Sequence, residues 1–205
     1  MACKIGSLVI GPVATNCYYV YDDEKNEALV FVPALYGEKI YDRLKKEGLT
    51  CAAILITHGN FDHISGANDL KKVSGARVYA PALENEMLAD PALNLSADGV
   101  SIIADQDVSD GDVLELGGME ITVLSTPGHT SGGCCYYFPK EKILISGDTL
   151  FCGSVGRTDL PTGSMSTLVR SIREKLMVLP DDVSVFPGHG DGTTIGEERN
   201  YNPYL

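Results

Sequence analysis

The sequence predicts an α/β fold in which β-sheets lie between helices. Apolar runs of strand length alternate with helical patterns in both halves of the chain, as is typical of layered α/β structures. The run at residues 51–56 is short and uninterrupted, as expected of a strand covered on both faces. With 205 residues, of which 44% are hydrophobic and 21% charged, the chain is long enough for one packed core, and we expect a single domain over residues 1–205.

The first half contains strand-like runs separated by two helical patterns. A helix is expected over residues 38–47, where Ile40 and Leu44 share one side and Gly48 would end it. A second helix is expected after His63, through Leu70 to Val73. Strands are expected at residues 4–10, 16–21, 27–32, 51–56 and 76–80.

The second half repeats this mixture of strands and helices. Four apolar residues recur at spacings of three, four and four, which predicts a helix that ends near residues 179–180: Met165, Leu168, Ile172 and Leu176. Strands are expected at residues 120–125, 133–138, 143–146 and 183–186.

The composition excludes several classes of partner. The formal net charge of −12 argues against binding to nucleic acid, which needs a basic surface, and against binding to an anionic membrane. The N-terminus shows no signal-peptide pattern, and no window approaches eighteen apolar residues. We therefore expect a soluble, cytoplasmic protein that acts on a small molecule; its oligomeric state is not predicted.

The chain has only four histidines, and each follows an apolar, strand-like run in a segment rich in Gly, Pro or Asp. One histidine after a strand is usually an ordinary loop residue. It is much less expected that all four would share this position by chance, together with two aspartates. Because loops at one end of a rigid sheet commonly carry binding sites, we take these side chains as candidate ligands: His58, Asp62, His63, His129, Asp148 and His189.

This set of donors indicates a transition-metal site. Imidazole nitrogen and carboxylate oxygen together suit Zn, Fe or Mn, whereas an all-oxygen set would suit Ca or Mg. The ligands exceed what one tetrahedral ion needs, and two ions that share one carboxylate would use them all. Such a pair activates water and polarises a carbonyl or phosphoryl oxygen. We expect zinc, as one or two ions, with Fe or Mn as alternatives.

The histidine and aspartate segments, in their order along the chain, resemble the metallo-β-lactamase superfamily, and the resemblance covers nearly the whole chain. Further segments look most like the glyoxalase II-like branch: residues 16–18, 146–151, 156–159 and 193–203. The resemblance implies an αββα sandwich with the metal ions at one edge. It also implies hydrolysis of a small thioester or ester, such as S-lactoylglutathione, through a metal-bound hydroxide.

The resemblance also implies a role for each candidate ligand. The first metal would be bound by His58, His129 and Asp148, and the second by Asp62, His63, Asp148 and His189. Asp148 would bridge the two ions, and Asp62 would orient the hydroxide, so these two are the candidate catalytic residues. Asn60 stands where the family has another histidine. A neutral amide oxygen is a weaker ligand for zinc than imidazole, so we expect the first site to bind less tightly.

A second departure from the family pattern lies at residues 32–34. Family members usually have Asp-Pro-Gly, whereas this chain has Val32-Pro33-Ala34. An aspartate at this position could orient a ligating histidine through a hydrogen bond. We hypothesise that the aspartate and the missing histidine act as a unit and that this chain has lost both. Independent drift, or an Asn60 that still binds metal, are the alternatives.

A third departure concerns the substrate. The larger glyoxalase II enzymes continue into a helical domain that helps to bind glutathione, whereas this chain ends at Leu205. They also have a tyrosine at the position of Asp159. Arg157 could bind a substrate carboxylate or could pair with Asp159. Arg157 and Tyr136 are therefore the candidate substrate-binding residues, and glutathione itself is not assigned.

Two alternatives to the hydrolase stay open. His58, His129 and Asp148 form a two-histidine, one-carboxylate set that suits non-haem iron, and the persulfide dioxygenases of the superfamily use the matching positions. The chain could also be a degenerate member that binds a metal or small molecule without turnover. The complete second ligand set argues against both alternatives.

Overall fold

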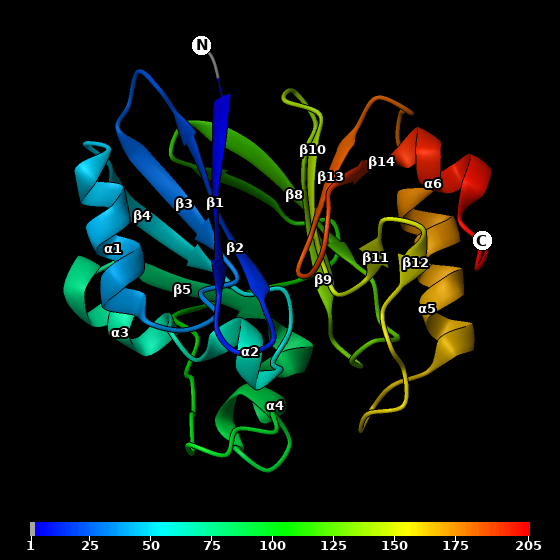
Figure 1. Ribbon diagram of the computed structural model, residues 1–205, viewed down its shortest axis with the longest axis horizontal. Helices are drawn as coiled ribbons and strands as arrows, with labels where there is room; N and C mark the ends of the chain where they lie inside the picture. The colour runs from blue at the N-terminus through cyan, green and yellow to red at the C-terminus, as the bar shows by residue number, and fades with distance from the viewer. Residues whose placement is uncertain (1–2) are drawn as a thin grey trace.

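The computed structural model, which describes residues 3–205, contains two six-stranded sheets packed face to face between two layers of helices (Figure 1). The strand order is β1-β2-β3-β4-β5-β6 in one sheet and β14-β13-β10-β9-β8-β7 in the other. A short pair, β11 (Leu150–Phe151) and β12 (Ser154–Val155), forms a separate hairpin. The predicted αββα sandwich is confirmed.

The first sheet combines an antiparallel meander with parallel strands. Strands β1, β2 and β3 pair antiparallel, and β4, β5 and β6 then continue the sheet in parallel. The bounds are β1 (Cys3–Ile10), β2 (Thr15–Asp22), β3 (Glu27–Phe31), β4 (Thr50–Leu55), β5 (Arg77–Pro81) and β6 (Gln106–Val108).

The second sheet is mostly antiparallel, but β10 and β13 run parallel. Strand β8 runs in the same direction as β10, because each pairs antiparallel with β9. The bounds are β7 (Val113–Leu116), β8 (Met119–Ser125), β9 (Cys134–Phe138), β10 (Ile143–Gly147), β13 (Ser184–Pro187) and β14 (Thr193–Thr194).

Helices cover the outer face of each sheet (Figure 1). Helix α1 (Gly37–Lys46) turns Ile40 and Leu44 towards the first sheet, and α3 (Ala67–Ser74) adds Leu70 to the same apolar cluster. On the second sheet, α5 (Met165–Ser171) continues as a π-helical segment (Ile172–Leu176) and is followed by α6 (Ile195–Tyr201). Short helices complete the first half: α2 (Phe61–Ile64), a 3₁₀ turn η1 (Ala82–Glu84) and α4 (Asn85–Ala89).

The apolar core between the sheets is built from side chains of both. Phe31 of β3 packs against Tyr136 and Phe138 of β9, with ring centroids 5.4 and 5.8 Å apart. All three rings are fully buried. This central layer fixes the distance between the sheets, and hence between the loops that leave their strands.

The expected elements are found with small shifts, but the structure also contains elements that were not expected. The helix expected after His63 is two helices, and His63 lies inside α2 rather than before it. Residues 82–118, for which no element was expected, contain η1, α4, β6 and β7. Helix α6 and the two-residue strands β11, β12 and β14 were also not expected. Each of these segments is too short to show a repeated apolar period.

Candidate metal centre

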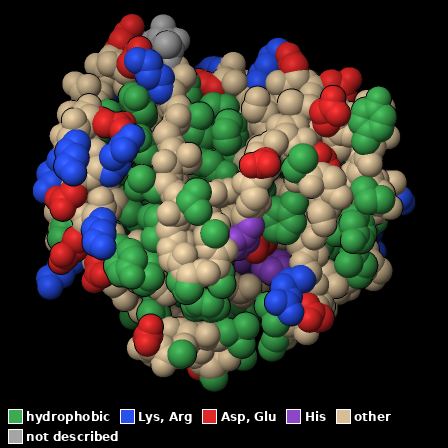
Figure 2. Space-filling model, in the orientation of Figure 1, with side chains coloured by type: hydrophobic (Ala, Val, Ile, Leu, Met, Phe, Trp, Pro, Cys, Tyr) green, Lys and Arg blue, Asp and Glu red, His purple; other side chains and the backbone are tan. Residues whose placement is uncertain are grey.

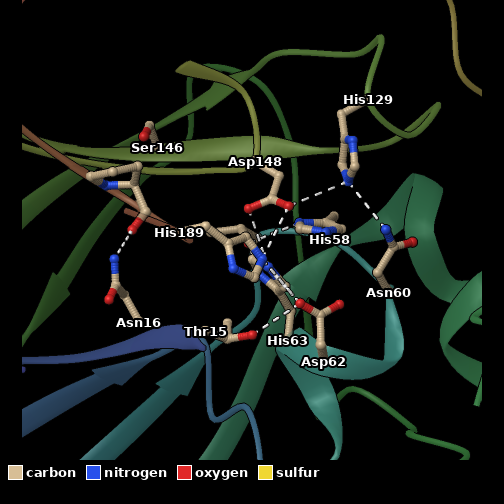
Figure 3. Close-up of polar contacts among 12 residues, drawn as sticks. Thr15, Asn16, His58, Asn60, Asp62, His63, His129, Ser146, Asp148 and His189 are labelled. Carbon is tan, nitrogen blue, oxygen red and sulfur yellow. Dashed lines mark hydrogen bonds and ion pairs between the residues drawn. The ribbon is translucent and has the colours of Figure 1, made fainter. Parts of the chain in front are cut away.

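Four imidazoles and two carboxylates meet at one edge of the sandwich (Figure 3). They come from segments that follow four strands. The segment after β4 supplies His58 and, through α2, Asp62 and His63; those after β8, β10 and β13 supply His129, Asp148 and His189. The structure therefore brings all six candidate ligands together, with Asn60 beside them.

Asp148 is the carboxylate that contacts most of the imidazoles. Its Oδ1 lies 3.2 Å from Nε2 of His63, and its Oδ2 lies 3.5 Å from Nε2 of His189 and 3.8 Å from Nε2 of His129. The side chain is only 12% exposed. A carboxylate between imidazoles in this way has the position of a bridging ligand.

Asp62 forms the second carboxylate contact with the histidines. Its Oδ2 accepts hydrogen bonds from Nε2 of His189, at 3.1 Å, and from the hydroxyl of Thr15, at 3.0 Å. Nε2 of His63 lies 3.5 Å from the same oxygen. Asp62, His63 and His189 thus offer three ligand atoms within 4.8 Å of one another. Thr15 orients the carboxylate.

His58, His63 and Asp148 form a second group of ligand atoms within 4.8 Å of one another. In the described part of the chain, Nε2 of His58, Nε2 of His63 and Oδ1 of Asp148 are buried and have no hydrogen-bond partner. A buried polar atom without a partner is costly. These atoms are nitrogen and oxygen donors of the kind that bind Zn, Fe or Mn. The residues present therefore fit a metal ion.

The site favours the metal-binding form of both carboxylates and of His58, whereas it favours the protonated form of His189. Burial and the neighbouring imidazoles keep the pKa of His58 well below its usual range, so this ring is neutral at pH 7. Burial alone would raise the pKa of Asp62 and Asp148, but the imidazoles outweigh it and both values are lowered. The hydrogen bond to Asp62 raises the pKa of His189.

The hydroxyl of Thr57 lies between two ligands. It is 3.1 Å from Nδ1 of His58 and 3.5 Å from Nδ1 of His63, whose ring centroids are 4.0 Å apart. If both rings carry their proton on Nδ1, Thr57 accepts from both, and both Nε2 atoms point their lone pairs into the site.

Both ring nitrogens of His129 form hydrogen bonds. Its Nδ1 donates to the backbone carbonyl of Arg157 at 2.8 Å, so Nε2 has the lone pair. The side-chain amide of Asn60 donates to this Nε2 at 3.1 Å. Asn60 thus contacts the atom of His129 that the resemblance assigns to the first metal.

Strand β2 holds the loop that carries His189. The side-chain amide of Asn16 donates to the carbonyls of Pro187 and Gly190, and the hydroxyl of Tyr18 also donates to Pro187. Gly188 passes so close to the ligands that a Cβ there would lie 2.2 Å from Oδ1 of Asp148. Only glycine permits this approach, which explains the Pro-Gly-His sequence.

The two candidate substrate-binding residues lie apart from the ligands. Arg157 is exposed, and its guanidinium forms two hydrogen bonds of 2.7 Å with the carboxylate of Asp159. This pair lowers the pKa of Asp159 to about 2. Tyr136 is fully buried, and its hydroxyl donates to the carbonyl of Ile56 at 2.8 Å. The structure therefore places Tyr136 in the core, and a substrate-binding role for it is corrected to a packing role.

Sequence reasoning missed three residues that hold the site in place: Thr15, Thr57 and Glu84. The two threonines lie next to recognisable segments, at residues 16–18 and 58–63. Glu84 lies in a segment without any motif, and nothing in the sequence points to it. Their functions depend on contacts between distant parts of the chain.

The site is accessible from one face of the molecule. Figure 2 shows histidine side chains at the bottom of a depression between the two halves. His189 is the most exposed of the ligands, at 29%, whereas His58 and His63 are buried. Among residues 3–205, no helix is long and apolar enough to cross a membrane.

Comparison with known proteins places the site in a family. Residues 10–189 match the model of the metallo-β-lactamase superfamily. The chain is 38% identical to a probable metallo-hydrolase, YqgX of Bacillus subtilis, over 96% of this chain and 94% of that protein. It is 35% identical to the hydroxyacylglutathione hydrolase GloC of Haemophilus influenzae, over 93% of this chain and 92% of that protein.

Solved structures show the same relationship. The BLEG-1 B3 metallo-β-lactamase has a TM-score of 0.93 and 39% identity, and covers 98% of this chain and 99% of its own. A di-iron-bound form of TTHA1623 has a TM-score of 0.87 and 32% identity, over 98% and 100%. ETHE1 of Myxococcus xanthus has a TM-score of 0.82 and 28% identity, over 98% and 83%. The similar proteins thus include enzymes with different names.

Proposed function

Because the chain belongs to the metallo-β-lactamase superfamily, we propose that it is a metal-dependent hydrolase that acts on a small thioester or ester. The observation that carries this proposal is the convergence around Asp148 of buried nitrogen and oxygen atoms that form no hydrogen bond. Buried nitrogen and oxygen atoms that form no hydrogen bond are explained if a metal cation normally lies among them. The similarity to a hydroxyacylglutathione hydrolase supports a thioester as the substrate.

The residues divide into two ligand groups that share Asp148. Asp62, His63, Asp148 and His189 form the complete group, and His58, His129, Asp148 and Asn60 form the altered one. When bound, zinc, iron or manganese supplies Lewis-acid polarisation of the scissile carbonyl and lowers the pKa of water. We favour zinc from the donor set, although a di-iron form of a similar protein keeps iron as the alternative.

Asp62 is the residue that would handle the proton of the attacking water. Both of its hydrogen bonds use Oδ2, which leaves Oδ1 to contact water or substrate. Thr15 and His189 hold the carboxylate in one orientation, and its lowered pKa keeps it ionised at neutral pH. An ionised carboxylate can orient a water molecule for attack on a carbonyl carbon.

The residues around the depression above the ligands determine which substrates can bind. Arg157 could contact a carboxylate of the substrate, but only if its guanidinium leaves Asp159. The proposal therefore names small thioesters and esters as a class. The single domain, the cytoplasmic location and the lack of a nucleic-acid partner that the sequence suggested stay predictions.

The iron-dependent oxygen chemistry of persulfide dioxygenases is supported less well. It would use His58, His129 and Asp148 alone, but Nε2 of His129 is bonded to the amide of Asn60. It also gives no role to Asp62, His63 and His189, whose ligand atoms already lie together. The structural similarity to ETHE1 nevertheless makes this the alternative to test.

The proposal is tested by assaying the purified chain, loaded separately with zinc, iron and manganese, against S-lactoylglutathione and short-chain acyl thioesters. We expect hydrolysis with at least one metal and a loss of about 100-fold or more in kcat/KM for Asp62→Asn, which keeps the shape but removes the charge. Asp69→Asn, at an exposed acidic residue on α3 outside the ligand groups, is the matched control and should keep full activity.

The same preparations separate the alternatives. Oxygen uptake with a glutathione persulfide, together with absence of thioester hydrolysis, would identify a dioxygenase. Metal binding without turnover of any thioester, ester or lactone would identify a binding protein. Either result would overturn the proposed hydrolase.

A further inference from the structure

Glu84 is a buried carboxylate that joins two ligand loops from outside the ligand groups. Its side chain is fully buried at the end of η1, in a segment that supplies no candidate ligand. One oxygen, Oε2, accepts the backbone N–H of Gly59 at 2.7 Å, and the other, Oε1, accepts the N–H of Gly132 at 2.7 Å. Each oxygen thus holds a different loop.

The two loops are those of the altered ligand group. Gly59 lies between His58 and Asn60, and Gly132 lies three residues after His129. The loops are far apart in the sequence and belong to different sheets, since one follows β4 and the other follows β8. Burial raises the pKa of Glu84, but the N–H groups of Gly59 and Gly132 that donate to its two oxygens favour the ionised form. Glu84 therefore sets the separation of the loops that carry His58 and His129.

The close fit of the backbone around Glu84 shows that this contact is built into the fold. A Cβ at Gly132 would lie 2.6 Å from the carbonyl carbon of Leu83 and 2.8 Å from Oε1 of Glu84. A Cβ at Gly59 would lie 2.8 Å from Cγ of Met87, on α4. Neither glycine has a positive φ, so close approach, rather than backbone conformation, is what requires glycine there.

The complete ligand group is held by other contacts. Asp62 is oriented by Thr15 of β2, and the loop of His189 is bonded to Asn16. Glu84 has no hydrogen bond to any of these residues. The segment of Gly59 also leads into α2, but Asp62 and the loop of His189 have these additional supports, whereas the loop of His129 is bonded to Glu84. A change at Glu84 should therefore affect the two groups unequally.

We propose that Glu84 is a positioning residue that holds the loops of His58 and His129 at the separation needed to bind the metal ion of the altered group. The inference rests on the proposed metal centre but not on the identity of the substrate. Its test can therefore be made by metal binding, whether or not the chain hydrolyses thioesters.

The test is a cobalt titration of Glu84→Gln, followed by absorption spectroscopy, in the wild-type chain and in the Asn60→His background. The amide of glutamine keeps one acceptor but places an NH₂ group against a backbone N–H. We expect the dissociation constant of the weaker ion to rise by about 10-fold or more, while that of the tighter ion stays within about twofold. Glu86→Gln, exposed on α4, is the matched control and should change neither.

Glu84→Asp tests whether the length of the side chain at residue 84 matters in addition to its negative charge. It keeps the negative charge but is one methylene shorter, so it cannot contact both amides at the present distance. We expect it to weaken the same ion as Glu84→Gln does; wild-type binding by Glu84→Asp would show that only charge matters and would overturn the positioning role. Amide hydrogen exchange at Gly59 and Gly132 in the metal-free chain should quicken in both variants.

Three further results would also overturn the proposal. The first is unchanged affinity for both ions in Glu84→Gln. The second is an equal loss for both ions that follows a fall in the thermal stability of the metal-free chain, because Glu84 would then serve only folding. The third is uptake of a single ion in both backgrounds, since the altered group would then bind no metal for Glu84 to support.

Discussion

The side-chain amide of Asn60 lies 3.1 Å from Nε2 of His129, the ring nitrogen that would otherwise face a metal ion. The other nitrogen of this ring donates to the carbonyl of Arg157, so the lone pair on Nε2 accepts from the amide. A metal ion in the altered group must compete with this hydrogen bond. The asymmetry between the two ligand groups therefore begins with Asn60.

Asn60→His should strengthen the altered group. It replaces a neutral amide with an imidazole and removes the hydrogen bond that occupies His129. We expect the dissociation constant of the weaker zinc ion to fall by about 10-fold or more, measured by competition with a chromogenic chelator. Asn68→His, exposed on α3, adds a histidine elsewhere and should leave both constants unchanged.

Val32→Asp should be coupled to Asn60→His if the two positions act as a unit. Val32 is buried at the end of β3 with a φ of 53°, a conformation that is unfavourable for a β-branched residue and better tolerated by aspartate. We expect the double variant to bind the weaker ion more tightly than the two single effects predict, by about 1 kcal/mol. Additive effects in this double-mutant cycle would show that the positions are independent.

Thr57→Val should weaken both ions, because the lost hydroxyl lies against one histidine of each ligand group. The substitution keeps the shape but leaves the Nδ1 atoms of His58 and His63 without this partner. We expect both dissociation constants to rise by about 10-fold, whereas Thr57→Ser, which keeps the hydroxyl, should stay close to wild type. Calorimetric metal titration measures both constants; a loss confined to one ion would contradict the shared role.

Arg157→Ala should leave metal binding unchanged, because only the backbone carbonyl of Arg157 contacts His129. If the guanidinium binds a substrate carboxylate, KM should rise by about 10-fold for a thioester that carries a carboxylate and should not change for one without it. Asp159→Asn, which frees the guanidinium, should lower the same KM. Steady-state kinetics with the two substrates test whether Arg157 binds the carboxylate. Equal KM values for the wild type, Arg157→Ala and Asp159→Asn would assign Arg157 a structural role.

That the candidate ligands would lie close together was predictable from the sequence because their signal is local. His58, His129 and His189 each follow an apolar strand, and a strand in a packed sheet delivers the next residues to a known edge. Tyr136, a candidate for substrate binding, lies within β9 rather than after it, and its side chain is in the core. The apolar pattern of a strand buried on both faces does not show which way a tyrosine points.

The residues that hold the ligands in place were not predictable. Thr15 contacts Asp62, which is 47 positions away, and Glu84 contacts Gly59, which is 25 positions away. No spacing in a single sequence encodes such contacts. Glu84 also lies in a short turn without periodic apolar residues. The hydrogen bond between Asn60 and His129 joins two sheets in the same way. The departure at Asn60 was visible in the sequence, but its effect on His129 required the fold.

Metal content, measured by elemental mass spectrometry on protein purified without a chelator or an added histidine tag, tests the central claim most directly. The account predicts one tightly held ion per chain after extensive dialysis, a second ion at excess zinc, and loss of both in Asp148→Asn, because both ligand groups share that carboxylate. A folded wild-type chain that holds no metal at any zinc concentration, or an Asp148→Asn variant that keeps its full complement, would contradict it.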